Sequence, residues 1–204
     1  MFLFFKPKIH EPESDQLAEV SNSPLGVICA SGLNCDQLPN AQGLFGTSYN
    51  NPIPVNGSVG TFKYLNKLHA STGAIYYHRL GSLHVDVSDK LIDAYEIVTW
   101  SGDFWDILFF DIYHPRRSNN APKHYTLRSY KTNPLGDIPF GFGADLFCPN
   151  FPYDLPLAVE RVTGMAALGR RVKERVEKTN YTRPLSHENK VMAVSSRLAS
   201  IKSL

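Results

Sequence analysis

Two runs of β-forming residues joined by a short turn constrain the fold of this chain more than any other feature. Residues 92–100 and 104–113 are rich in aromatic and β-branched side chains. Ser101-Gly102-Asp103 between them is a short loop in which the glycine can adopt a positive φ. Both faces of the second run are apolar, which is typical of a strand that is covered on both sides. We therefore predict a buried hairpin at the centre of the fold.

The distribution of proline marks the limits of the regular sheet. Six of the 14 prolines lie between residues 7 and 54, seven lie between residues 115 and 156, and residues 55–114 contain none. Proline cannot donate a hydrogen bond to a neighbouring strand and is confined to edges and turns. The sheet is therefore expected mainly within residues 74–113, and residues 1–57 are expected to form an irregular arm and wrap.

The hydrophobic period changes from that of a strand to that of a helix after residue 153. Residues 155–176 carry an apolar helical stripe behind a possible N-cap at Asp154, and a second stripe follows Pro184. Gly164 and Gly169 each cost about 1 kcal/mol relative to alanine inside a helix, so a break or a close contact is possible there. We predict an α+β fold, in which residues 58–204 form one domain and two C-terminal helices cover a mostly antiparallel sheet.

Charge balance and cysteine content bear on the partners and the cellular compartment of the protein. The chain has 204 residues and a net charge of +2, from 21 basic and 19 acidic residues, which favours neither nucleic acid nor a membrane surface as a partner. An odd number of cysteines, Cys29, Cys35 and Cys148, fits a reducing compartment, and we expect a cytoplasmic protein. The apolar residues 2–5 could pack on the body or join two copies of the chain in a homo-oligomer.

The first candidate site follows the second β-run, at His114-Pro115-Arg116-Arg117-Ser118. Arg116, Arg117 and Ser118 could bind a phosphate or a carboxylate, because guanidinium groups offer planar forks of donors. Asp111, three residues before His114, could orient that imidazole for proton transfer. The structural alternative is a strand exit in which the arginines pair with acidic residues and His114 caps a turn.

A second group, His78 and Arg79, ends another predicted strand at residues 74–80. If the two strands were neighbours, His78, Arg79, His114 and Arg116 could converge on one basic cleft, and two histidines could perform acid–base catalysis near neutral pH. A shift of one residue in register would place a side chain on the opposite face and defeat this hypothesis.

Other chemical signatures are weak, and we predict neither a metal nor a cofactor. His84-Val85-Asp86 contains the His-x-Asp pair of a non-haem iron site, but the later histidine with suitable spacing, His187, lies in a helical pattern. Gly141-Phe142-Gly143 is expected to be a loop rather than a nucleotide-binding turn. The basic run that begins at Arg170 contains glutamates at helical spacing, which favours a solvated helix face.

Two classes of function remain open on this evidence. The first is a non-catalytic interaction protein, such as an adaptor, immunity or regulatory protein, which could contact a protein partner through aromatic residues of its loops. The second is an enzyme or sensor that acts on a small anionic ligand through the histidines and arginines at the strand ends. The aromatic residues considered for the contact surface are Tyr49, Phe140, Phe142, Phe147 and Phe151.

Overall fold

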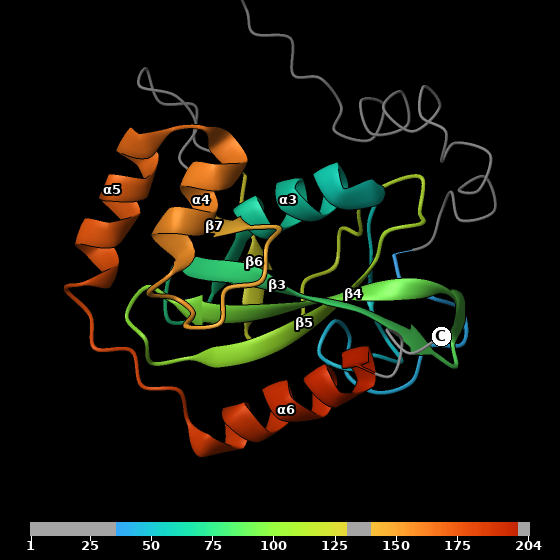
Figure 1. Ribbon diagram of the computed structural model, residues 1–204. Helices are drawn as coiled ribbons and strands as arrows, with labels where there is room; N and C mark the ends of the chain where they lie inside the picture. Colours follow the sequence, from blue (N-terminus) through green and yellow to red (C-terminus); the bar gives the residue numbers. More distant parts are fainter. Residues whose placement is uncertain (1–35, 130–139, 200–204) are drawn as a thin grey trace, which may run out of the picture.

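A curled five-stranded sheet organises the computed structural model, which describes residues 36–129 and 140–199 (Figure 1). Its strands are β1 (Ile53–Pro54), β3 (Ile75–Val85), β4 (Ser88–Thr99), β5 (Trp105–Asp111) and β7 (Gly141–Ala144). Their spatial order is β1-β5-β4-β3-β7. The central strands β3, β4 and β5 form an antiparallel meander, whereas both edge strands run parallel to their neighbours.

The predicted α+β class is confirmed, and the two β-rich runs form the neighbouring strands β4 and β5. The expectation of a mostly antiparallel sheet holds for the three central strands but not for the edges. The edge strands β1 and β7 come from proline-rich segments on either side of the proline-free window. Each reaches the sheet through a long connection, and such a connection permits a parallel neighbour where a tight hairpin does not.

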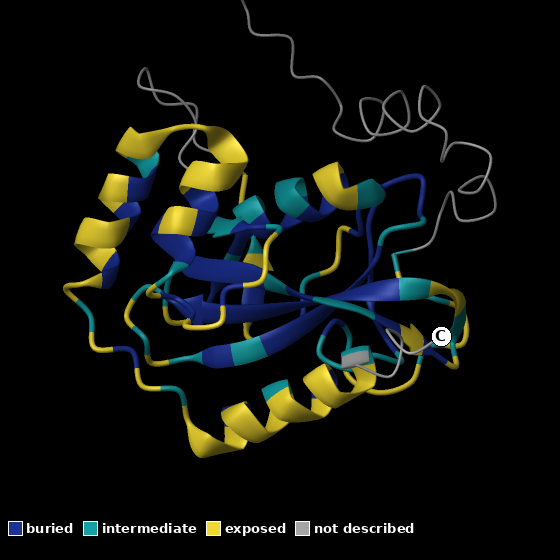
Figure 2. Ribbon diagram, viewed as in Figure 1, coloured by how far each residue is buried: buried dark blue, intermediate teal, exposed yellow. Residues whose placement is uncertain are grey.

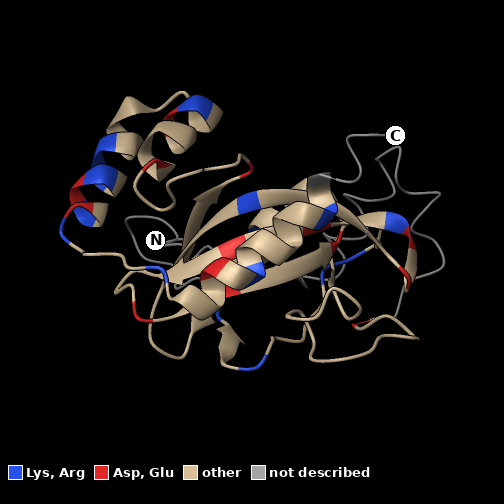
Figure 3. Cartoon of the chain, turned by 60° about the horizontal axis from the view of Figure 1, so that its bottom comes forward, with Lys and Arg blue, Asp and Glu red and all other residues tan. Residues whose placement is uncertain are grey.

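Four helices occur in the described residues, where the sequence pattern predicts two helices at the C-terminal end. Helix α3 (Gly57–Lys67) precedes β2 (Leu68–Ala70), which pairs with β6 (Tyr125–Leu127) in a separate two-stranded sheet. The apolar stripe after residue 154 forms two helices, α4 (Leu155–Thr163) and α5 (Ala166–Val176), because Gly164 adopts φ +68° and ends the first of them. The last helix, α6 (Leu185–Ala199), lies across the sheet (Figure 3).

Helices cover both faces of the sheet, so its central part is buried, whereas the end of the β3–β4 hairpin is partly exposed (Figure 2). Tyr64 of α3 packs on Tyr95 and Phe110 in the cluster on one face. On the opposite face Trp105 belongs to a cluster with α4 and α5, and Ile107 to a cluster with α6. Alternation of side chains along β4 and β5 produces this division.

Several predictions concern residues outside the described ranges. These are the apolar arm at residues 2–5 and the thiols Cys29 and Cys35. The described part of the expected wrap, residues 36–56, contributes β1 to the main sheet. Among residues 36–129 and 140–199, no helix combines the length and the apolar composition that crossing a membrane requires.

Candidate functional site

A buried carboxylate, Glu96, lies at the centre of the sheet face that α6 covers. It is 0% exposed and pairs in register with His78 of β3 and Ile107 of β5. His78 Nε2 lies 2.7 Å from Glu96 Oε2, and His187 Nε2 of α6 lies 3.0 Å from Oε1. Arg183, just before α6, places Nε 2.8 Å from Oε1 and donates from a terminal nitrogen to Oε2 at 3.1 Å. Three donor side chains thus surround one carboxylate.

The surroundings of Glu96 define the charge of this cluster. Burial alone would raise the pKa of Glu96, but hydrogen bonds with His187 and His78 and the charge of Arg183 lower it to about 2. The backbone N–H of Cys148 donates to His78 Nδ1 at 3.1 Å. Nδ1 therefore accepts a hydrogen bond, which leaves Nε2 as the ring atom that donates to Glu96.

Aromatic rings close the cluster from the sides. The Phe151 ring lies 4.4 Å from the His78 ring, and Trp105 packs against both His187 and the Arg183 guanidinium.

Burial, Asp154 and Glu96 raise the pKa of the neighbouring Cys148 thiol to about 12, so this thiol is not an activated nucleophile. Within the described segments, no group of three or more His, Cys, Asp or Glu residues is placed to hold a metal ion. The cluster therefore acts as a polar clamp that fixes α6 and the segment before it to the sheet.

The residues after β5 form a second and separate polar cluster. His114 Nε2 lies 3.3 Å from Asp111 Oδ2, while the Tyr113 N–H donates to Asp111 Oδ1 at 3.0 Å. Arg116 is 5% exposed and donates to the carboxylate of Asp36. Burial would raise the pKa of Asp36, but Arg116 and the Asn119 N–H lower it. Arg116 is therefore paired with an acidic residue, as expected for a structural strand exit rather than for an anion-binding site.

The structure does not bring the two predicted histidine–arginine groups together. His78 aligns with Glu96 and Ile107, and Asp111 lies four residues farther along β5. At about 3.3 Å per residue, this spacing puts Asp111 roughly 13 Å along the sheet from the row of His78. Arg79 joins neither cluster, because it donates to Ser82 and to Asp93 Oδ1, at 2.6 and 2.8 Å. His78, His114 and Arg116 therefore do not form a common cleft.

Arg117 and Ser118 line a small polar pocket beside the C-terminus of α3. The pocket has a volume of about 160 Å³ and also includes Lys67 and Arg128. Ser118 Oγ donates to the backbone oxygen of Asp36 at 2.7 Å. Two of the residues predicted to bind a ligand, Arg117 and Ser118, therefore line one pocket, but they lie away from His78.

A groove of about 330 Å³, larger than the pocket at Arg117, lies along the contact between α4 and α5. The two helices approach closely at Gly169, where an added Cβ would lie 2.9 Å from the backbone oxygen of Pro156. Tyr153, Leu157 and Val176 supply an apolar lining, and Leu157 is 62% exposed. The charged residues of the lining are Glu160, Arg170, Lys173 and Glu177.

Positive charge gathers on the helices that form this groove (Figure 3). Residues 155–178 contain six Lys and Arg against three Glu, a net charge of +3, compared with +2 for the whole chain. Arg175 stacks at 3.8 Å from the centroid of the Trp100 ring, and Lys173 pairs with Glu177 at 3.7 Å. Met165, between the helices, is 56% exposed. The charged lining of the α4–α5 groove is balanced, with Arg170 and Lys173 against Glu160 and Glu177, and the excess of positive charge lies on the helices as a whole.

Sequence reasoning missed Glu96, Arg183 and His187 as a group, although one signal was present. Glu96 interrupts an apolar strand, and a carboxylate in such a strand requires a partner.

Of the aromatic residues expected in the loops, Phe147 is 61% exposed and Phe151 is buried. Tyr49, Phe140 and Phe142 have intermediate exposure.

Comparisons of the chain with protein-family models, with curated proteins and with solved structures find no match. The inference of function therefore starts from the clusters and cavities of the described residues. Among these, the Glu96 clamp is buried beneath α6, whereas the α4–α5 groove lies at the surface.

Proposed function

We propose that the protein is a non-catalytic interaction protein that binds an acidic, amphipathic helix of a protein partner in the α4–α5 groove. The observation that carries this proposal is an exposed apolar side chain, Leu157, in a groove between two helices that together carry a net charge of +3. An amphipathic helix would insert apolar side chains between α4 and α5, as in other helix-in-groove complexes. Three cysteines in the chain make the cytoplasm the expected location.

The size and charge of the groove support a peptide segment as the occupant. Its volume of about 330 Å³ lies at the lower end of the roughly 300–1,000 Å³ typical of small-molecule pockets, and it suits a few anchoring side chains. The net charge of +3 on residues 155–178 would attract an acidic segment and speed its association. The apolar contacts would then supply most of the affinity.

The polar clusters support a non-catalytic role. His78 and His187 are buried and hydrogen-bonded to Glu96, and Arg116 is buried against Asp36. The Nε2 atoms of both histidines and the Arg116 guanidinium are already directed at carboxylates of the protein. A general acid or base must instead reach a substrate proton directly or through one water molecule.

Site-specific photocrosslinking tests the proposed surface. A photoreactive amino acid replaces Leu157 in the groove, and a matched variant carries it at Met192, which is 65% exposed on α6. We expect crosslinks from position 157 to an acidic helical segment of one protein, and far fewer from position 192. The purified segment should then bind the unmodified chain in isothermal titration calorimetry.

Two results would contradict the proposal. Equal crosslinking from the two positions would show that the groove has no preferred partner. A crosslink that joins two copies of this chain, together with a dimer in native mass spectrometry, would replace the acidic partner by self-association.

A further inference from the structure

A pocket of about 230 Å³, here called the Trp100 pocket, lies on another face of α5 from the α4–α5 groove. Its aromatic wall consists of Tyr76 in β3, Trp100 just after β4 and Phe142 in β7. The wall from α5 is formed by residues three and four positions apart, which share one face of a helix. These residues are Leu168, Arg171, Val172 and Arg175. Within the described part of the chain, the two cavities share no lining residue.

Hydrogen bonds and ring contacts hold the aromatic wall in place. Trp100 Nε1 donates to the carbonyl of Ile75 at 3.1 Å, and the Trp100 ring lies 5.7 Å from the Tyr76 ring. Tyr76 is 1% exposed, whereas Trp100 and Phe142 are only partly buried. A fixed aromatic wall that remains accessible suits a flat apolar ligand, because little ordering is needed when the ligand binds.

The charged groups of this lining are both positive. Arg171 and Arg175 line the pocket, and its described lining contains no acidic residue. The α4–α5 groove differs in this respect, because its cations face two glutamates. Within residues 36–129 and 140–199, neither guanidinium is paired with a carboxylate, and the ion pair within α5 and its C-cap joins Lys173 to Glu177. The pocket therefore complements a ligand that carries a negative charge.

Arg175 links the charged and aromatic parts of the pocket. Its guanidinium carbon lies 3.8 Å from the centroid of the Trp100 ring. Stacking on an aromatic face orients the planar guanidinium and leaves the N–H groups at its edge available to an oxyanion. Arg171 lies four residues earlier, one helical turn away, so both arginines can reach the same ligand group.

We propose that the Trp100 pocket binds a small aromatic carboxylate. The ring of the ligand lies against Trp100 and Phe142, and its carboxylate accepts hydrogen bonds from Arg171 and Arg175. Guanidinium groups match the two oxygens of a carboxylate with paired donors. The volume of about 230 Å³ is below the roughly 300–1,000 Å³ typical of drug-sized ligands, which favours a ligand with a single ring. This site and the α4–α5 groove use different residues, so a failure of either proposal leaves the other standing.

A titration followed by heteronuclear NMR tests this site with phenylacetate as the probe. The chain contains two tryptophans, Trp100 and Trp105, and only Trp100 lines the pocket. Their indole N–H signals therefore report on the pocket and on a site outside it, and Trp105→Phe assigns them. Phenylacetamide is the neutral reference compound, cyclohexylacetate is the non-aromatic one, and sodium chloride at matched ionic strength controls for salt.

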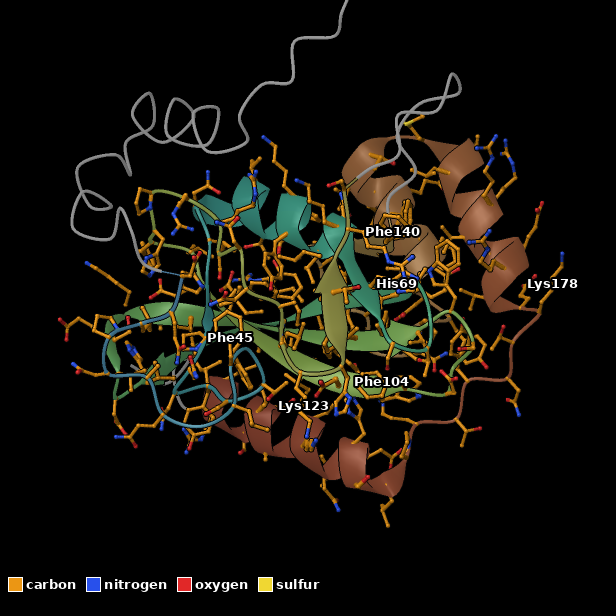
Figure 4. All side chains as sticks on the ribbon, turned by 180° about the vertical axis from the view of Figure 1, so that it is seen from behind. Phe45, His69, Phe104, Lys123, Phe140 and Lys178 are labelled. Carbon is orange, nitrogen blue, oxygen red and sulfur yellow. The ribbon has the colours of Figure 1, made fainter. Side chains whose placement is uncertain are left out.

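Three substitutions test the role of the arginines. Arg171→Met removes an exposed cation and keeps an apolar side chain, and Arg175→Lys keeps the charge but removes the planar fork. The control Lys178→Met removes an exposed cation just after α5, at the outside of the molecule (Figure 4). Thermal denaturation without ligand verifies that each variant is folded.

We expect phenylacetate to shift the Trp100 indole signal saturably and to leave the Trp105 signal nearly unchanged. Its affinity should fall about tenfold in Arg171→Met and in Arg175→Lys and stay unchanged in Lys178→Met. Both reference compounds should bind more weakly than phenylacetate. The proposal is overturned if phenylacetate gives no saturable shift, if either reference compound binds as tightly, or if Arg171→Met binds phenylacetate as tightly as the control does.

Discussion

Glu96 is a fully buried carboxylate whose pKa is lowered by its neighbours. A carboxylate with no exposed surface would be strongly unfavourable alone, and it is stabilised here by Arg183, His78 and His187. Removing one member of a buried ion pair leaves an uncompensated charge, which costs more than the pair itself contributes. Glu96 is therefore expected to be important for stability.

Replacing Glu96 by glutamine keeps the shape of the side chain and removes its charge. We expect Glu96→Gln to lower the free energy of unfolding by roughly 3 kcal/mol at pH 7, because Arg183 loses its counter-ion. The matched change Glu174→Gln, on the exposed side of α5, should alter it by less than about 0.5 kcal/mol. Urea denaturation measures both values, and equal stability of the two variants would contradict the clamp.

The same carboxylate predicts how stability depends on pH. Its pKa is about 2 in the folded chain, below the ordinary 4.5, so the unfolded chain binds the proton more readily. The stabilisation is fully present above about pH 4.5, is lost as the pH falls toward 2, and is on the order of 3 kcal/mol. The stability difference between the wild type and Glu96→Gln should therefore shrink between pH 6 and pH 2. A difference that stays constant over this range would refute the assignment.

Among the elements, β7 shows why an edge strand was missed. Glycine is a poor strand former, and the sequence Gly141-Phe142-Gly143 was expected to be a loop. In the structure a Cβ at Gly141 would lie 2.1 Å from the Leu65 oxygen, and one at Gly143 would lie 2.0 Å from the Tyr77 oxygen. Both positions need glycine because the main chain of β7 lies against α3 and β3. That requirement comes from the tertiary structure and leaves no local signal.

The close contact of β7 with β3 gives a prediction for Gly143→Ala. We expect this change to cost about 3 kcal/mol, at the upper end of the range for overpacking, because the obstructing atom belongs to the backbone. Gly164→Ala is the matched control. Its Cβ would meet nothing within 4 Å, and only the left-handed conformation should cost about 1–2 kcal/mol. Chemical denaturation that ranked the control as the less stable protein would argue against this packing.

At the scale of the whole molecule, local patterns predicted the centre of the fold and long-range contacts determined the rest. The β3–β4–β5 meander follows from alternation and short turns that lie within one proline-free window. The Glu96 clamp instead joins residues 87 and 91 positions apart, through Arg183 and His187. Sequence spacing cannot specify such pairs, because they depend on where α6 returns to the sheet. The predicted convergence of His78 with His114 was not found because β4 lies between β3 and β5 and because β5 ends four residues beyond the row of His78.

Stability and partner binding should respond to substitutions at different residues. Glu96 belongs to the buried clamp, whereas Arg170 and Lys173 line the exposed groove. Changes in the clamp should alter stability and leave binding intact at permissive temperature. Changes at the rim of the groove should have the opposite effect, since they remove charge without disturbing the core.

The affinity of the crosslinked acidic segment for the charge-reversal variant Arg170→Glu/Lys173→Glu is the most direct test of the proposed function. We predict that the variant melts within a few degrees of the wild type and binds the segment at least about a hundredfold more weakly at low salt, a loss of about 2.7 kcal/mol. Rising salt should narrow this difference, since the charges are exposed. Equal affinities of the folded variant and the wild type would contradict the assignment of the α4–α5 groove as the binding surface.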